Sequence, residues 1–263
     1  MSTVVTERDG RVLVARLNRP DVLNAFDPEM TDRLARVVDE AESDPGVHVL
    51  TITGTGRAFS AGHDLSAPPD PGREFGTAAM FKKLTLFPKP LVLAINGLAV
   101  GLGVTLTSFA DVAVIADDAR LRCPFVGMGL TAEAGSTYQL TRLLGPQRAA
   151  WFLMSGAWLS ARESVEAGLA MECVPGGRVL DRAREMAGVL AAQPLNPLME
   201  TKRLLNAPHR EALIASIRAE NEAVMRLREA PAYREAVNAF RARREPDFSE
   251  ANLARYSTED EDR

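Results

Sequence analysis

The sequence predicts an α/β fold of stacked sheet and helix layers, followed by a helical region. Through the first half of the chain, strand-like segments alternate with helix-like ones, a pattern typical of layered α/β folds. From Arg178 onward almost every segment has helical spacing, and prolines mark the restarts. The 263 residues are 46% hydrophobic and 25% charged, as expected of a globular chain with a sizeable core. We therefore place an α/β core at residues 1–190 and a helical region at 191–263.

The first half is expected to alternate between strands and helices. Short apolar runs bounded by turn residues predict strands at 12–17, 47–53, 91–95 and 111–115. Helical spacing predicts a helix that starts at Pro28 and ends at Asp44, and further helices at 75–87 and 101–109. A surface loop rich in proline, glycine and aspartate is expected at 68–72.

The second half contains fewer strand-like segments. Residues 131–144 are expected to form a helix, which a Gly-Pro pair ends. Ser160 and Glu163 form a Ser-x-x-Glu capping box, which predicts the start of another short helix. One more strand is expected at 171–174, and a charged, frayed end at 257–263. Helices are expected to fill most of the remainder.

Composition and charge argue against several classes of function. The net charge of −4 disfavours nucleic acid or an acidic membrane surface as a partner. Cys123 and Cys173 show neither a CxxC pattern nor a Cys/His cluster, so we expect no disulfide, no metal site and a reducing compartment. The polar N-terminus is unlike a signal peptide, and the longest apolar run, 90–104, is short and interrupted by glycine. A cytoplasmic protein without a membrane span is expected.

Two turns give the first indication of chemistry. Residues 58–65, Ala-Phe-Ser-Ala-Gly-His-Asp-Leu, and residues 96–103, Asn-Gly-Leu-Ala-Val-Gly-Leu-Gly, each leave an apolar run through small residues. Two main-chain N–H groups exposed at such turns and aimed at one point form an oxyanion hole, worth roughly 10²–10³ in rate per donor. The alternative is a helix start packed tightly against a strand. Leu106 stands where a dinucleotide-binding motif has its last glycine, so that motif is absent.

These two turns, with other segments in the same order, resemble the crotonase (enoyl-CoA hydratase/isomerase) superfamily. The resemblance covers nearly the whole chain and is carried by segments 17–26, 58–65, 90–103, 111–113, 140–145, 160–168 and 238–248. It implies a spiral of ββα units and a C-terminal helical trimerisation region, with homotrimers or dimers of trimers. It also implies an acyl-CoA thioester substrate and neither a metal nor a redox cofactor.

The resemblance also assigns the oxyanion hole and the path of CoA. The main-chain N–H groups of His63 and Leu102 would form the hole, although Leu102 stands where many members have glycine. We expect His63 to act through its main chain rather than its ring, because no serine or cysteine nucleophile lies near it in sequence. The residues lining the path of adenine and pantetheine would be Ala61, Asp64, Leu65 and Ser66.

The expected catalytic groups depart from those of the hydratases in the superfamily. The two hydratase glutamates fall on Thr105 and Phe125 here, neither of which can transfer the protons that adding water requires, and Phe125 makes the site drier. Residues 129–136 resemble the peroxisomal-type 3,2-enoyl-CoA isomerase branch, whose catalytic glutamate matches Glu133. The local alternative is that Glu133 is an acid in the first turn of a helix, stabilised by the helix dipole by about 0.3–1 kcal/mol.

Residues further along the chain have competing interpretations. In the family, basic residues and a phenylalanine near this C-terminal position approach CoA, often that of a neighbouring subunit, which makes Arg243 and Phe248 candidates. A solvated helix face is the alternative for the arginine. Trp151 and the apolar residues that follow it are expected in the core or in the wall of the acyl pocket.

Isomerisation of a 3-enoyl-CoA to a 2-enoyl-CoA is therefore the expected activity. Glu133 would take a proton at C2 and return it at C4, while the oxyanion hole holds the enolate. A first alternative is an enoyl-CoA hydratase with an unrecognised second group beside Glu133. A second is a non-catalytic acyl-CoA-binding protein of the same fold. RNA binding, reported for some relatives, is disfavoured by the acidic charge balance.

Overall fold

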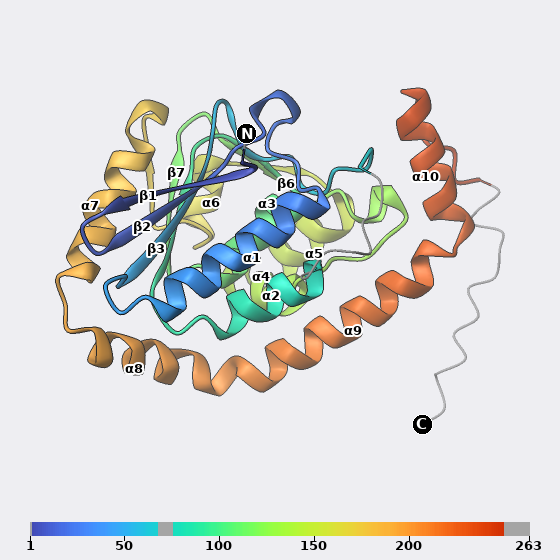
Figure 1. The fold of residues 1–263 in the computed structure, drawn as a ribbon. Helices are drawn as coiled ribbons and strands as arrows, with labels where there is room; N and C mark the ends of the chain where they lie inside the picture. Colours follow the sequence, from blue (N-terminus) through green and yellow to red (C-terminus); the bar gives the residue numbers. More distant parts are fainter. Residues whose placement is uncertain (1, 68–75, 250–263) are drawn as a thin grey trace.

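The computed structural model describes residues 2–67 and 76–249 of the chain (Figure 1). The expected loop at 68–72 and the frayed end at 257–263 lie outside these residues, as does the start of the helix expected at 75–87. Figure 1 shows a strand and helix body, with the last helices running along its lower edge.

A six-stranded sheet forms the centre of the molecule. Its order is β1-β2-β3-β5-β7-β10, and all pairs are parallel except β1 with β2. The strands are β1 (Val4–Asp9), β2 (Val12–Leu17), β3 (Val49–Gly54), β5 (Leu91–Ile95), β7 (Val112–Ala116) and β10 (Glu172–Val174). Every residue of β3 and β5 is buried, which explains why these strands are continuous apolar runs rather than alternating ones.

A second, smaller sheet has four short strands. Its order is β4-β6-β8-β9, formed by β4 (Ala58–Ser60), β6 (Leu98–Val100), β8 (Arg120–Arg122) and β9 (Trp158–Ser160). Strands β3, β5 and β7 of the large sheet are each followed by a short strand of the small sheet and then by a helix. The chain is thus a succession of ββα units, which confirms the predicted crotonase-type fold. Because β4 and β6 are neighbours, the turns that follow them meet.

Ten α-helices lie among the described residues. They are α1 (Pro28–Ser43), α2 (Thr77–Leu86), α3 (Leu102–Thr105), α4 (Ser136–Leu144), α5 (Pro146–Ser155), α6 (Ala161–Glu166), α7 (Val179–Ala191), α8 (Leu195–Asn206), α9 (Arg210–Arg228) and α10 (Pro231–Ala242). Asp27 caps α1 by accepting the Met30 N–H at 2.7 Å. None of the described helices is long and apolar enough to cross a membrane.

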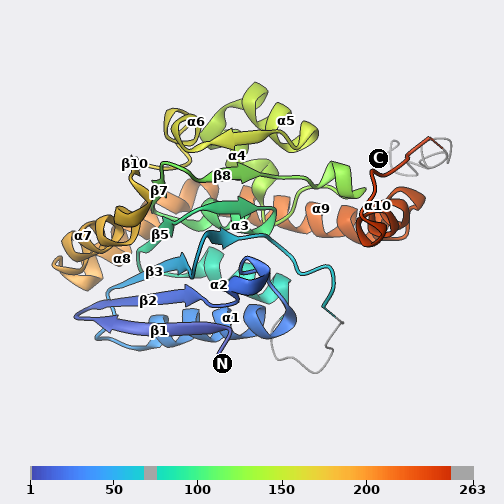
Figure 2. The ribbon, with the colours of Figure 1, turned by 90° about the horizontal axis from the view of Figure 1, so that it is seen from above.

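The last three helices differ from those that cover the sheet. Helix α7 packs across β2, β3, β5 and β7, whereas α8 has no buried residue and α9 buries only Leu213 and Glu220. Figure 2 shows α10 at the side of the molecule opposite α7. The predicted boundary at residue 190 falls at the end of α7, and a domain division there stays a prediction.

Two local predictions have different outcomes. The capping box is confirmed, because Ser160 accepts the Glu163 N–H and the Glu163 side chain accepts the Ser160 N–H. The helix expected at 131–144 is wrong at its start, since α4 begins at Ser136. Ala134 and Gly135 have positive φ angles of 65° and 73°, a left-handed conformation that no helix can continue through. Glu133 therefore lies in a loop, not in a first helical turn.

Candidate active site

A cavity of about 440 Å³ lies where the turns after β4 and β6 meet the loop before α4. The ends of α9 and α10 close its other side. Its lining contains most of the predicted site residues, namely Ala61, His63, Asp64, Leu65, Ser66, Leu102, Phe125 and Glu133. The topology thus brings together residues from both halves of the chain.

Glycines allow the two turns to touch. Gly62 has a φ of +87°, and a Cβ there would lie 2.7 Å from the carbonyl oxygen of Val100 and 3.5 Å from the nitrogen of Leu102. A Cβ at Gly103 would lie 2.6 Å from the carbonyl oxygen of Ser60. The distances of 2.7 and 2.6 Å to the two carbonyl oxygens are too short for a Cβ atom, so Gly62 and Gly103 need to be glycine for the backbones to approach. The predicted close packing and the predicted donors therefore belong to one arrangement.

The geometry of each turn leaves the expected N–H groups available. Phe26 donates to the carbonyl of Gly62 at 2.7 Å and accepts from Asp64 at 2.9 Å, so the N–H of His63 between them points away from Phe26. Leu102 is the first residue of α3, where a helical N–H has no partner within the helix. Within the described part of the chain, neither N–H donates to a main-chain carbonyl. Both residues line the cavity.

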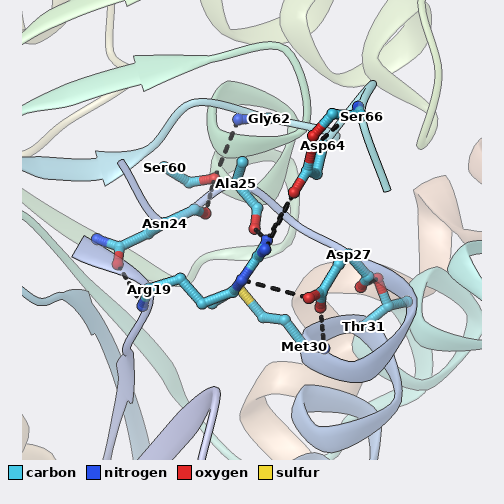
Figure 3. A network of polar contacts seen from close by, with 10 residues as sticks. All are labelled: Arg19, Asn24, Ala25, Asp27, Met30, Thr31, Ser60, Gly62, Asp64 and Ser66. Atoms are coloured by element: carbon cyan, nitrogen blue, oxygen red, sulfur yellow. Dashed lines mark hydrogen bonds and ion pairs between the residues drawn. The ribbon is translucent and has the colours of Figure 1, made fainter. Parts of the chain in front are cut away.

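A buried asparagine supports the first turn from behind (Figure 3). Asn24 donates through its side chain to the carbonyl oxygens of Thr55 and Ala58 at 2.9 and 2.8 Å. Its own carbonyl accepts the Ser60 hydroxyl at 2.8 Å, and that hydroxyl accepts the Gly62 N–H at 3.1 Å. Because each of these polar groups is paired, the turn that carries His63 is held in one geometry.

Both oxygens of the Asp64 carboxylate accept hydrogen bonds from neighbouring residues. Arg19 donates to one Asp64 oxygen from two guanidinium nitrogens, both at 3.0 Å, and also pairs with Asp27 at 3.2 Å (Figure 3). Ser66 donates to the other Asp64 oxygen from its N–H and its hydroxyl at 3.0 and 2.6 Å. Burial raises the pKa of Asp64, but the Ser66 hydrogen bonds and Arg19 outweigh it, and the net pKa is lowered.

The imidazole of His63 lies against Glu133. Its Nε2 is 3.3 Å from each carboxylate oxygen and hydrogen-bonds to Oε2, while Oε1 is buried with no hydrogen-bond partner among the described residues. The ring of His63 thus contacts the candidate catalytic acid, and the expectation that His63 acts through its main chain rather than its ring stays a prediction. The two residues are 70 apart in sequence, and nothing in either segment signals this contact.

Burial and the charge of Glu133 shift the pKa values of His63 and Cys123. Burial alone lowers the pKa of His63, but the charge of Glu133 and the hydrogen bond to it outweigh burial, and the net pKa is raised. The positive charge of Arg228 reduces that rise. Burial raises the pKa of the Cys123 thiol, and the charge of Glu133 adds to the effect. Cys123 therefore stays protonated and is no nucleophile.

The positions of the hydratase glutamates hold no acid in the structure. Thr105 is fully buried, and its hydroxyl donates to the carbonyl of Leu102 at 3.1 Å. Phe125 is 9% exposed and forms part of the cavity wall, beside Met128 and Leu130. The position of the second hydratase glutamate is therefore part of an apolar stretch of the cavity wall.

The C-terminal helices supply cavity residues that sequence reasoning missed. Val224 and Arg228 of α9, with Tyr233 and Phe240 of α10, line the cavity of their own chain. The one local signal is Gly129, where a Cβ would lie 2.5 Å from the nitrogen of Tyr233. A glycine that marks close packing does not reveal which helix packs there.

Three expected residues are not among the described residues that line this cavity. Arg243 ends α10 in a left-handed conformation, and neither it nor Phe248 is among the described residues that line the cavity. Their contact with CoA stays a prediction. Trp151 is 69% exposed and lines a separate surface hollow, so its placement in the core or the acyl pocket is wrong for this chain. Phe152 beside it is buried as expected.

Known proteins of similar sequence and structure extend over nearly the whole chain. The sequence model of the family described as Enoyl-CoA hydratase/isomerase matches residues 7–251. The 1,2-epoxyphenylacetyl-CoA isomerase of Escherichia coli (strain K12) is 32% identical, over 95% of this chain and 99% of its own length. The 2,3-dehydroadipyl-CoA hydratase of the same strain is 31% identical, over 94% and 99%. A crystal structure of an enoyl-CoA hydratase/isomerase from Pseudoalteromonas atlantica T6c has a TM-score of 0.89 at 28% identity, covering 94% of this chain and 100% of that one.

Proposed function

Because the chain belongs to the enoyl-CoA hydratase/isomerase family, we propose that it shifts the double bond of a 3-enoyl-CoA thioester to give the 2-enoyl-CoA isomer. One observation carries the proposal. Glu133 presents a buried carboxylate oxygen without a hydrogen-bond partner among the described residues, in the cavity that His63 and Leu102 also line. The other lining carboxylate, Asp64, is occupied by Arg19 and Ser66.

The reaction needs one group that accepts and then returns a proton. With the thioester carbonyl between the N–H groups of His63 and Leu102, Glu133 removes a proton from C2, and the electrons of that C–H bond delocalise onto the thioester oxygen. The carboxylic acid thus formed gives the proton to C4 as the double bond moves between C2 and C3. No atom is gained or lost, so neither water nor a redox group takes part.

The surroundings of Glu133 favour this proton shuttle over the addition of water. Phe125, Met128 and Leu130 line the same cavity as Glu133, and these apolar side chains limit the water available to the enolate. The His63 ring hydrogen-bonds to Oε2 of Glu133, and Oε1 is buried without a hydrogen-bond partner among the described residues. The hydroxyl of Thr105 is turned to the main chain and cannot act as a second acid.

Hydration of a 2-enoyl-CoA is the second candidate function, and the contact of His63 with Glu133 is the observation that favours it. A hydratase has to activate water and protonate C2, and an imidazole next to a carboxylate can supply the second proton-transfer group. Relatives of this chain carry both kinds of name, isomerase and hydratase. The fold alone does not distinguish the two reactions.

A comparison of two reactions in one enzyme preparation tests the proposal. Purified enzyme is given 3-hexenoyl-CoA, and formation of the conjugated 2-enoyl thioester is followed by ultraviolet absorbance; water addition to 2-hexenoyl-CoA is measured in parallel. We expect isomerisation to exceed hydration, and Glu133→Gln to lower it by roughly 10²–10⁴-fold. Isomerisation by Glu133→Gln at the parent rate would refute the assignment. Hydration that exceeds isomerisation and is lost in His63→Gln would favour the second candidate.

A further inference from the structure

We infer that Glu220, on α9, is a positioning residue that fixes the main chain beside Glu133 and so sets where the Glu133 carboxylate lies in the cavity. This inference rests on the proposed role of Glu133 as the acid and base of the reaction. Glu220 itself does not line the cavity in the described part of the chain.

Glu220 is a buried carboxylate whose partners are hydrogen-bond donors. Its side chain accepts the N–H groups of Gly135 and Thr137 at 2.6 and 2.8 Å, and the Thr137 hydroxyl. A weaker contact comes from the Ser216 hydroxyl at 3.3 Å. The residue is 4% exposed, and its hydrogen-bond partners in the described part of the chain are all uncharged donors. Burying a carboxylate is costly unless hydrogen-bond donors replace water, and these donors take the place of water around the Glu220 side chain.

The main chain that Glu220 holds has an unusual conformation. Ala134 and Gly135 directly follow Glu133, and both have positive φ angles. Such a conformation is uncommon for alanine and persists only where the surroundings enforce it. Ser136 donates to the main-chain carbonyl of Glu133 from its N–H, at 3.1 Å, and from its hydroxyl. Glu220 accepts the N–H groups on either side of Ser136, so the loop is fixed immediately after Glu133.

One face of α9 connects this contact to the cavity. A Cβ at Gly135 would lie 2.3 Å from Leu213 Cδ1 and 3.1 Å from Ile217 Cγ1, so the loop is packed directly on the helix. Glu220 follows on the same face, and Val224 and Arg228 continue it at helical spacing into the cavity wall. The helix that forms part of the pocket therefore also fixes the loop of Glu133.

A simple helix-capping role is the alternative, because a carboxylate at the start of α4 also stabilises that helix. The two roles differ in what they change. If Glu220 only caps the helix, its substitution lowers the stability of the fold but leaves kcat of the folded enzyme unchanged. If Glu220 positions Glu133, its substitution lowers kcat while the affinity for the CoA thioester is retained, since misplacing a reacting group by about 1 Å costs roughly 10²-fold.

The test uses Glu220→Gln in the full chain, assayed with 3-hexenoyl-CoA. Glutamine keeps the size of the side chain but turns one acceptor oxygen into a donor that faces an N–H. We expect kcat to fall about tenfold or more while KM changes by less than about twofold. Glu163→Gln is the matched control, because Glu163 caps α6 outside the site. It should lower the urea midpoint without changing kcat.

A double variant shows whether Glu220 acts through Glu133. If it does, adding Glu220→Gln to Glu133→Gln should lower the residual rate by less than about twofold. An unchanged kcat in folded Glu220→Gln would overturn the inference, whatever its stability, as would full additivity in the double variant. If Glu220→Gln does not fold, Thr137→Val removes one donor to Glu220, and kcat equal to that of the parent would overturn the inference instead. An active Glu133→Gln would refute the proposed function separately.

Discussion

His63 carries two features at one position, a main-chain N–H at the turn and a ring against Glu133. The N–H follows from the turn after β4, which Asn24 and the glycines stabilise. The ring contact follows from the loop before α4, which packs on α9 and brings Glu133 within 3.3 Å of Nε2. A substitution at this position that keeps the main chain therefore separates the two contributions.

The raised pKa of His63 predicts a pH-dependent difference in stability between the parent and His63→Gln. A group whose pKa is higher in the folded state stabilises the fold below its unfolded pKa, about 6.5 for histidine, and loses this contribution as pH rises through the folded pKa. The parent should thus exceed His63→Gln in urea midpoint by more at about pH 5.5 than at about pH 8.5. A constant difference across that range would contradict the charge interaction with Glu133.

At the residue level, the sequence indicates the candidate acid and the two candidate N–H donors, but not the residues that hold them in place. Glu133, His63 and Leu102 lie in segments that resemble a known family, so each is found without knowing its contacts. The ring of His63 and the carboxylate of Glu220 act on residues 70 or more positions away. No local pattern in a single sequence encodes such a contact, which depends on how α9 packs.

Two short turns and one loop, rather than the long helices and strands, determine the geometry of the site. The turns after β4 and β6 approach because Gly62 and Gly103 lack a side chain. The loop before α4 is shaped by the left-handed Ala134 and Gly135. Long apolar runs such as β5 are predictable from sequence, whereas β4 and β6 have only three residues each and show no periodicity. Residues 132–134 favour a helix by their intrinsic propensity, but the positive φ angles of Ala134 and Gly135 exclude one there.

Substitution of Gly62 by alanine tests the close approach of the turns. The added Cβ would lie 2.7 Å from a main-chain oxygen at a φ of +87°, so the turn has to move. We expect Gly62→Ala to lower the free energy of unfolding by about 1–3 kcal/mol and to reduce isomerisation more than tenfold, roughly the effect of losing one oxyanion donor. Gly177→Ala is the control, since Gly177 has nothing within 4 Å and no positive φ. Equal activity of both variants would contradict the arrangement.

In the molecule as a whole, the α/β body carries the predicted donors and the acid, while the C-terminal helices close the cavity. Figure 1 shows α8 and α9 running along the edge of the body to α10 at the far side. Helix α9 serves both as support for the Glu133 loop and as cavity wall. Large apolar residues remain exposed on α8 and α9 of the single chain, including Leu205 at 70% and Met225 at 65%.

Those exposed residues, together with the family resemblance, predict a homotrimer or a dimer of trimers. Apolar side chains on helices with so few buried residues gain stability when a second copy covers them. Sedimentation equilibrium should give a mass of three or six chains of 28.5 kDa. A monomeric mass at micromolar concentration would contradict this expectation without affecting the assignment of the cavity.

The path of a single hydrogen tests most directly whether Glu133 alone shuttles the proton. A 3-enoyl-CoA carrying deuterium at C2 is converted in a single turnover, and the 2-enoyl product is analysed by mass spectrometry and NMR. If one shielded carboxylate accepts and returns the proton, part of the deuterium removed from C2 appears at C4 while the other deuterium stays at C2, and Glu133→Gln forms no labelled product on the same timescale. Absence of deuterium from C4 of the product, with turnover unchanged in Glu133→Gln, would contradict it.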